Sequence, residues 1–365
     1  MKKTVLIVIC LFSTSIFAKG NPIKSKMKTN IDELTAFAFR KDPIYKTKAL
    51  LISRDNKIIY EKYSQGISPD SPQPVQSAGN IILNIAVGFA KANHFFDERK
   101  DLFSEYPDMP KEWSKLISLD HLMRFSSGLR YYNDHESEEK PNLAFWSNEE
   151  TNKSDLQKKY AEFQSRQLYP PGKTFNFSFA DRNLATLLIK KSFVKISLEN
   201  FIQEKLIKEF KLNNTTFRFQ ENSGFANHPS INKSIFYVES TARDLAKLVS
   251  LYTNEGKFNK KTYFNKDWLT YSWKVSDSQI TMPPGRTTLG TESYGAYWFL
   301  NKRFSPYYDL AFKNLPESLV LIRGYKGQMI AIIPEKKMFI IRIADDSRGG
   351  VKEMNDILTL ANNLE

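Results

Sequence analysis

The sequence contains one cysteine, Cys10, among 365 residues. Cys10 lies in an apolar run that follows the basic start Met1-Lys2-Lys3 and ends near Ala18. This pattern is typical of a secretory signal peptide that is removed, so we expect residues 1–18 to be cleaved and the mature chain to lack both disulfides and thiol chemistry. A lipid anchor on Cys10 is the less favoured alternative, because bulky Ile9 precedes it.

Other absences exclude whole classes of function. No later run reaches the ~18 apolar residues that a membrane-spanning helix needs. No block of arginine and lysine alternates with aromatic residues, so nucleic acid is not an expected partner. His94, His135 and His228 have no acidic partners at metal-ligand spacing, and no Gly-x-Ser-x-Gly turn occurs. We therefore expect an exported, periplasmic or secreted protein with no integral membrane span and no metal or organic cofactor.

The charge balance is basic, with 53 Lys and Arg against 40 Asp and Glu and a net charge of +13. A well-solvated basic surface explains this excess most simply. The functional alternative is attraction to acidic polymers, such as cell-wall glycans, or to anionic lipid.

The chain divides into a polar lead-in, residues 19–44, and one large domain, residues 45–365. The lead-in has a short helical segment at residues 31–40 and is expected to pack loosely. Strand patterns occur near the start of the domain (49–53 and 57–63) and near its end (319–323, 328–333 and 337–343), before a last helix at 351–364. We predict an α/β (α+β) fold: an antiparallel sheet built from both ends of the chain, with flanking helices and an inserted helical lobe.

Ser77 stands where a nucleophile belongs. It follows a proline-rich loop and precedes residues 80–90, whose apolar positions have helical spacing, so it should lie at the start of a helix. Residues three apart share a helix face, which places Asn80 beside Ser77. A serine needs a base, and the Asn80 amide cannot act as one. From the residues alone, a helix cap is the favoured role of Ser77.

Several stretches, taken in order, form a familiar pattern. They are the hairpin leading to Ser77, Ser126-Ser127-Gly128-Leu129, Pro171-Gly172, Ser240-Thr241-Ala242-Arg243-Asp244, and Gly324-Tyr325-Lys326-Gly327-Gln328. With them, the chain from about residue 45 resembles the β-lactamase-related serine hydrolases. That group includes class C β-lactamases, DD-peptidases and 6-aminohexanoate-dimer hydrolases.

The resemblance implies three catalytic motifs, and all three depart from the family pattern. Ser-x-x-Lys keeps its serine at Ser77 but has Asn80 at the lysine position. Phe177 replaces the tyrosine of Tyr-x-Asn. Tyr325-Lys326-Gly327 aligns with the strand motif Lys-Thr-Gly or His-x-Gly. The backbone N–H groups of Ser77 and Gln328 would bind the oxyanion.

These losses lead to a main hypothesis and two alternatives. The first is a binder of small-molecule, peptide or cell-wall-fragment ligands whose catalytic centre has decayed. The second is a divergent esterase, amidase or peptidase that uses Ser77 with Lys326 or Tyr325 as the substitute base. The third is a structural envelope protein whose cleft is filled by side chains such as Phe177 and Phe179. His121 is expected to be a buried or capping residue.

Overall fold

The computed structural model describes residues 22–97, 117–128, 170–173, 175, 179–220, 235–275, 293–302, 310–347 and 350–364. The expected signal peptide lies outside these ranges. None of the helices within them is long and apolar enough to cross a membrane. The helices are α1 (Pro22–Ala38), α2 (Asn80–Ala92), α4 (Leu119–Met123), α7 (Phe179–Ser192), α8 (Leu198–Phe201) with its continuation η3 (Ile202–Lys208), α10 (Ala242–Thr253), α11 (Lys266–Ser272) and α12 (Val351–Asn362).

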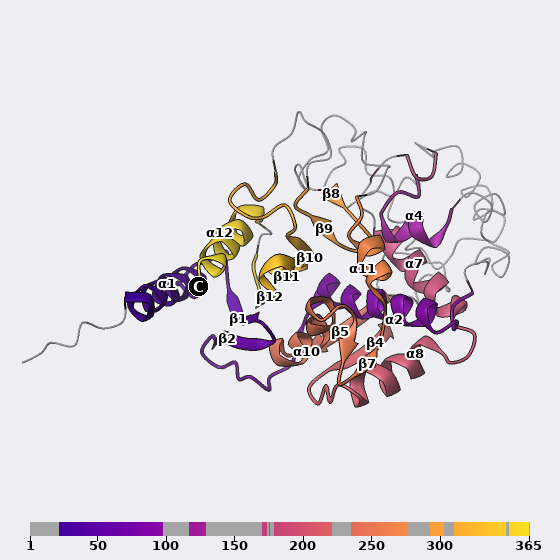
Figure 1. Cartoon of the computed structure of the whole chain (residues 1–365), viewed down its shortest axis with the longest axis horizontal. Helices are drawn as coiled ribbons and strands as arrows, with labels where there is room; N and C mark the ends of the chain where they lie inside the picture. Colours follow the sequence, from indigo (N-terminus) through magenta and orange to yellow (C-terminus); the bar gives the residue numbers. More distant parts are fainter. Residues whose placement is uncertain are drawn as a thin grey trace, which may run out of the picture.

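The main sheet has seven strands in the order β2-β1-β12-β11-β10-β9-β8. Its first and last segments pair directly, because β1 runs antiparallel to β12. This confirms that the two ends of the domain build one sheet (Figure 1). The strands are β1 (Thr47–Arg54), β2 (Lys57–Tyr63), β8 (Ser293–Tyr294), β9 (Phe299–Leu300), β10 (Val320–Gly324), β11 (Gln328–Ile333) and β12 (Met338–Ala344).

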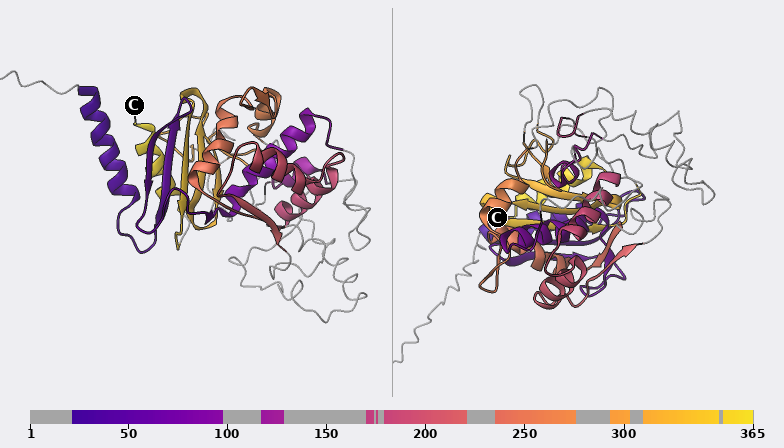
Figure 2. Two further views of the ribbon diagram at one scale, coloured as in Figure 1. Left: turned by 90° about the horizontal axis from the view of Figure 1, so that it is seen from below. Right: turned by 90° about the vertical axis from the view of Figure 1, so that its right-hand side faces the viewer.

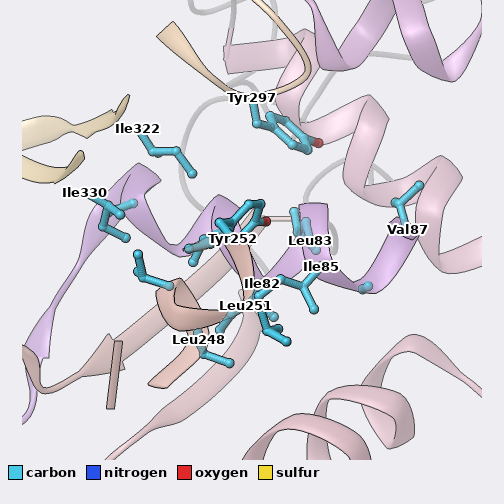
Figure 3. Packing of buried hydrophobic residues seen from close by; sticks show 14 of the residues in the cluster. Ile82, Leu83, Ile85, Val87, Leu248, Leu251, Tyr252, Tyr297, Ile322 and Ile330 are labelled. Atoms are coloured by element: carbon cyan, nitrogen blue, oxygen red, sulfur yellow. The ribbon is translucent and has the colours of Figure 1, made fainter. Parts of the chain in front are cut away.

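Both faces of this sheet are buried, which explains why its central strands are almost continuously apolar. Successive residues of β1 alternate between two apolar clusters: Leu50 and Ile52 pack on the side of α1 and α12, and Ala49 and Leu51 on the side of α2 and α10. Figure 2 shows the sheet between these two helical layers. Ile322 and Ile330 face α2 and α10 in the close view of Figure 3.

The lead-in packs more closely than the sequence predicted. It forms α1, whose Leu34 and Ala38 are buried among residues of α12. Arg40, just beyond α1, also forms an ion pair of 2.8 Å with the buried Glu353 of α12. The mainly polar composition of this segment did not indicate that one side of the helix is apolar.

A small second sheet, in the order β3-β5-β4, leads the chain to Ser77. Its strands are β3 (Gln73–Pro74), β4 (Thr216–Gln220) and β5 (Ile235–Ser240). Thr241 caps α10 directly after β5, because its side chain accepts a hydrogen bond of 3.1 Å from the Asp244 N–H. His121 is confirmed as a capping residue, since it exchanges hydrogen bonds with Ser118 at the start of α4.

Candidate active site around Ser77

Ser77 lies in a short turn, η1 (Gln76–Gly79), directly before α2. The Val75 N–H donates to the Val238 carbonyl at 3.0 Å, which ties the turn to the small sheet. Neither η1 nor α2 is capped by a side-chain hydrogen bond, and the residue at the cap of α2 is Gly79. Ser77 is therefore not a helix cap here, and its half-buried side chain is available for another role.

The nitrogen that reaches Ser77 belongs to an arginine. Arg182 of α7 donates from Nη1 to Ser77 Oγ across 3.0 Å. The two residues are 105 positions apart in the chain. The sequence analysis missed Arg182; the signal was a charged pair, Asp181-Arg182, just before the apolar part of a helix.

Arg182 cannot act as a general base. Burial lowers the pKa of its guanidinium, but an arginine stays protonated in proteins and has no acceptor atom. Its hydrogen bond to Ser77 Oγ favours negative charge on that oxygen without removing the proton. The centre therefore contains a hydroxyl and a cation where acyl transfer needs a hydroxyl and a base.

Asn80, expected at the lysine position of the family motif, is the first residue of α2. Its side chain is only 6% exposed. Its assignment to the lysine position stays a prediction.

The other two motifs fare differently. Phe177, at the tyrosine position, lies outside the described residues. Tyr325-Lys326-Gly327, which aligns with the family's strand motif, forms the turn η5 between β10 and β11, where its residues predicted a turn. Strand β10, which ends at Gly324, approaches η1, the turn that contains Ser77. A Cβ placed on Gly324 would lie 3.1 Å from the Ala78 N atom.

Lys326 has a partner other than Ser77. It has the left-handed φ of 61°, and its ammonium donates to Asp345 Oδ1 across 2.7 Å. This bond raises the pKa of Lys326, which holds the lysine protonated and is the opposite of what a general base needs. Tyr325 is 68% exposed.

Gln328 is the first residue of β11 and pairs with Gly324. Its amide bonds to the neighbouring strand β12, since Nε2 donates to the Ala344 carbonyl at 2.6 Å and Oε1 accepts from the Ala344 N–H at 3.2 Å. Only its backbone N–H was expected to serve the site, and that role stays a prediction.

The close approach of Gly324 to η1 leads to a test. In Gly324→Val, the new Cβ would lie 2.9 Å from the Gln328 Cβ as well as close to the Ala78 N atom, so the serine turn and β10 must separate. We expect a loss of about 1–3 kcal/mol in the free energy of unfolding, measured in urea. Gly66→Asn is the control, because no atom lies within 4 Å there and asparagine tolerates its positive φ. Equal losses in the two variants would contradict the close packing.

An acidic residue, Asp181, precedes Arg182 in α7. Asp181 is buried, and Ser127 donates to it from Oγ across 2.7 Å. Burial raises the pKa of Asp181 to about 8, so the carboxyl group is mainly neutral at pH 7. No group of three or more potential metal ligands occurs in the part of the chain that the structure describes.

Comparisons with known proteins agree with this architecture. Solved structures that it resembles include a putative 6-aminohexanoate-dimer hydrolase from Bacillus anthracis, with a TM-score of 0.63 and 16% identity over 91% of this chain and 80% of that chain. A class C β-lactamase matches with a TM-score of 0.61 and 15% identity over 94% of this chain and 97% of that chain. At these identities the likeness shows the fold alone.

No curated protein sequence matches this chain. The family model described as Beta-lactamase matches residues 46–362, which include the sheet, Ser77 and Arg182. The chain therefore belongs to the Beta-lactamase family, whose serine hydrolase fold it shares.

Proposed function

We propose that this protein is an exported member of the family that binds a peptide or cell-wall-type ligand at the Ser77 site with little or no turnover. Export is supported by the signal-peptide pattern of residues 1–18. The net charge of +13 favours acidic polymers of the cell envelope as the surroundings in which the ligand is met.

One observation carries the proposal: the nitrogen at hydrogen-bond distance from Ser77 Oγ is a guanidinium. Acyl transfer requires a group that accepts the serine proton and later returns it to the leaving group. Loss of such a group typically lowers the rate by about 10²–10⁴. Asn80 and Arg182 both lack this capacity, and the Lys326 ammonium is bound to Asp345.

The test is the intact mass of the mature protein after long incubation with a fluorophosphonate probe and with benzylpenicillin. A class C β-lactamase serves as the positive control: it should form the fluorophosphonate adduct, and it should convert benzylpenicillin to the hydrolysed product. We expect no stoichiometric adduct on this protein, because its serine is not activated.

Ser77→Ala and Ser71→Ala identify the source of any adduct. Ser71 is the matched control, because its hydroxyl bonds only to nearby Ser68 in a surface loop. A stoichiometric adduct that persists in Ser71→Ala and disappears in Ser77→Ala would overturn the proposal and favour the divergent hydrolase. Lys326 and Tyr325 would then be replaced in turn.

A further inference from the structure

A second pocket lies toward the opposite end of α2 from Ser77. It is bordered by the second half of α2 and by α4, α7 and α11, which gather on the right-hand side of Figure 1. Ser77 precedes the first residue of α2, whereas Val87 and Lys91 in the pocket wall follow roughly 10–16 Å further along that helix. The pocket is therefore separate from the candidate active site.

The pocket has a volume of about 130 Å³ and a mainly apolar wall. Val87 of α2 and Leu188 of α7 contribute aliphatic side chains, and Trp268 and Tyr271 of α11 contribute two aromatic rings. An apolar cavity of about 150 Å³ is large enough to hold a benzene ring. Because Asp120 at the edge is partly exposed, a group attached to such a ring can extend toward solvent there. The space therefore suits one aromatic ring with a small substituent.

Trp268 is fixed beside the pocket. Gly88 of α2 leaves room for its indole, since a Cβ on Gly88 would lie 2.5 Å from Trp268 Cδ1. The indole Nε1 donates to Asn84 Oδ1 across 3.1 Å. The ring also stacks on Tyr271, with 5.0 Å between the two centroids. These contacts fix the aromatic wall, and a fixed wall lowers the entropy cost of binding.

Asp120 provides the polar end of the pocket. Arg124 Nε donates to its Oδ1 across 2.6 Å, and the Tyr271 hydroxyl bonds to the same oxygen. Within the described part of the chain, Asp120 Oδ2 accepts no hydrogen bond. Burial acts to raise the pKa of Asp120, but Arg124 and Tyr271 outweigh it and hold the pKa below its usual value, so the carboxylate is ionised. Oδ2 is thus a charged acceptor at the edge of an apolar space, and hydrogen bonds to charged groups are among the strongest.

The charges around the pocket favour a neutral ligand. Asp120 carries one negative charge, whereas Arg124 and Lys91 carry two positive charges; Arg124 Cζ and Lys91 Nζ lie 4.8 and 5.5 Å from the centre of the Tyr271 ring. A cationic ligand would meet this excess of positive charge. An anionic ligand would be repelled by Asp120 and would leave Oδ2 without a donor. An uncharged donor avoids both costs.

We propose that this pocket binds a small uncharged aromatic molecule whose hydroxyl group donates to Asp120 Oδ2. The ring lies between the aliphatic side chains of Val87 and Leu188 and the aromatic side chains of α11, and the hydroxyl lies at the partly exposed edge. Burial of the ring supplies the affinity, and the hydrogen bond selects molecules that carry a donor. The inference does not depend on the proposed function of the Ser77 site.

The test is calorimetric titration of the mature protein with phenol and with anisole, in which a methyl group replaces the hydroxyl hydrogen. Benzylamine tests the preference for an uncharged ligand. Val87→Phe places a ring inside the pocket, and Val194→Phe makes the same change at a residue that is 58% exposed. Asp120→Asn is compared with Asp267→Asn, which changes an exposed residue of α11. Urea unfolding of every variant is measured in parallel.

We expect phenol to bind saturably, and anisole and benzylamine to bind at least about ten-fold more weakly, equivalent to about 1.4 kcal/mol. Val87→Phe should abolish phenol binding while the protein remains folded. Asp120→Asn should bring the phenol and anisole dissociation constants close together, because an amide NH₂ can donate to the oxygen of either molecule. Both controls should bind phenol like the wild type.

Five results would overturn the inference: no binding of phenol, equal binding of phenol and anisole by the wild type, tighter binding of benzylamine than of phenol, phenol binding that persists in folded Val87→Phe, or an unchanged ratio of the phenol and anisole dissociation constants in Asp120→Asn. If Val87→Phe failed to fold, Asp120→Asn with its control would decide the matter. The adduct experiment at Ser77 is independent, so a failure of either proposal leaves the other standing.

Discussion

Asp346→Ala is expected to lower the free energy of unfolding by about 3–5 kcal/mol, because it leaves a buried arginine without its carboxylate. Arg342 and Asp346 are 0% and 2% exposed and form two hydrogen bonds, of 2.7 and 2.9 Å. Arg342 also donates to Thr47 Oγ1 and to the Gly327 carbonyl, each at 2.9 Å. The pair thus joins β1 and β12 to the turn beside the serine site.

The control for Asp346→Ala is an exposed pair with the same spacing in the chain. Lys352 and Asp356 also lie four residues apart, but their charged atoms are 3.8 Å apart and the lysine is 91% exposed. Asp356→Ala should change stability by no more than about 0.5 kcal/mol. Urea unfolding followed by circular dichroism measures both variants. Similar losses of unfolding free energy in Asp346→Ala and Asp356→Ala would show that burial does not make the Arg342–Asp346 pair more stabilising than an exposed pair.

The second large effect concerns pH. The folded pKa of Asp181, about 8, is above its ordinary value of 3.8. Between these values the folded state binds a proton that the unfolded state has lost, so stability should fall as pH rises from about 4 to 8. The slope from this group reaches at most about 1.4 kcal/mol per pH unit. Below pH 4 both states are protonated, and the group no longer contributes a slope.

Asp181→Asn should remove this part of the pH dependence, because the amide is neutral throughout and can still accept from Ser127. Asp42→Asn is the control with the opposite sign. Backbone N–H groups of Tyr45 and Ile44 lower the pKa of Asp42, so its contribution is lost only as pH falls toward acid. The free energy of unfolding of both variants and of the wild type is measured in urea at several pH values. An unchanged slope between pH 5 and 8 in Asp181→Asn would contradict a neutral Asp181.

The local structure could be read from the sequence because it depends on neighbouring residues. Short apolar runs placed β10, β11 and β12 within a residue or so of their observed ends, and two separate groups of runs predicted one sheet from both ends of the chain. Turn-forming residues marked the hairpin at Asp55 and Asn56, both of which have positive φ. The start of α2 beside Ser77 followed from the same reasoning.

The lead-in shows where that reasoning was insufficient. Its helix, α1, has weak apolar spacing, and only its packing on α12 reveals that Leu34 and Ala38 belong to the core. Helix stability in proteins comes largely from tertiary contacts of this kind. A polar composition therefore did not predict how closely the segment would pack.

The sequence by itself determined the family, the sheet and the place of Ser77 directly before a helix. Only the tertiary structure decided which side chain meets the Ser77 hydroxyl. Arg182 lies 105 residues from Ser77, and Lys326 bonds to Asp345 after a turn that no periodic pattern describes. Periodicity reports which residues are buried, but the partner of a buried polar group is chosen by how distant helices and strands pack in space.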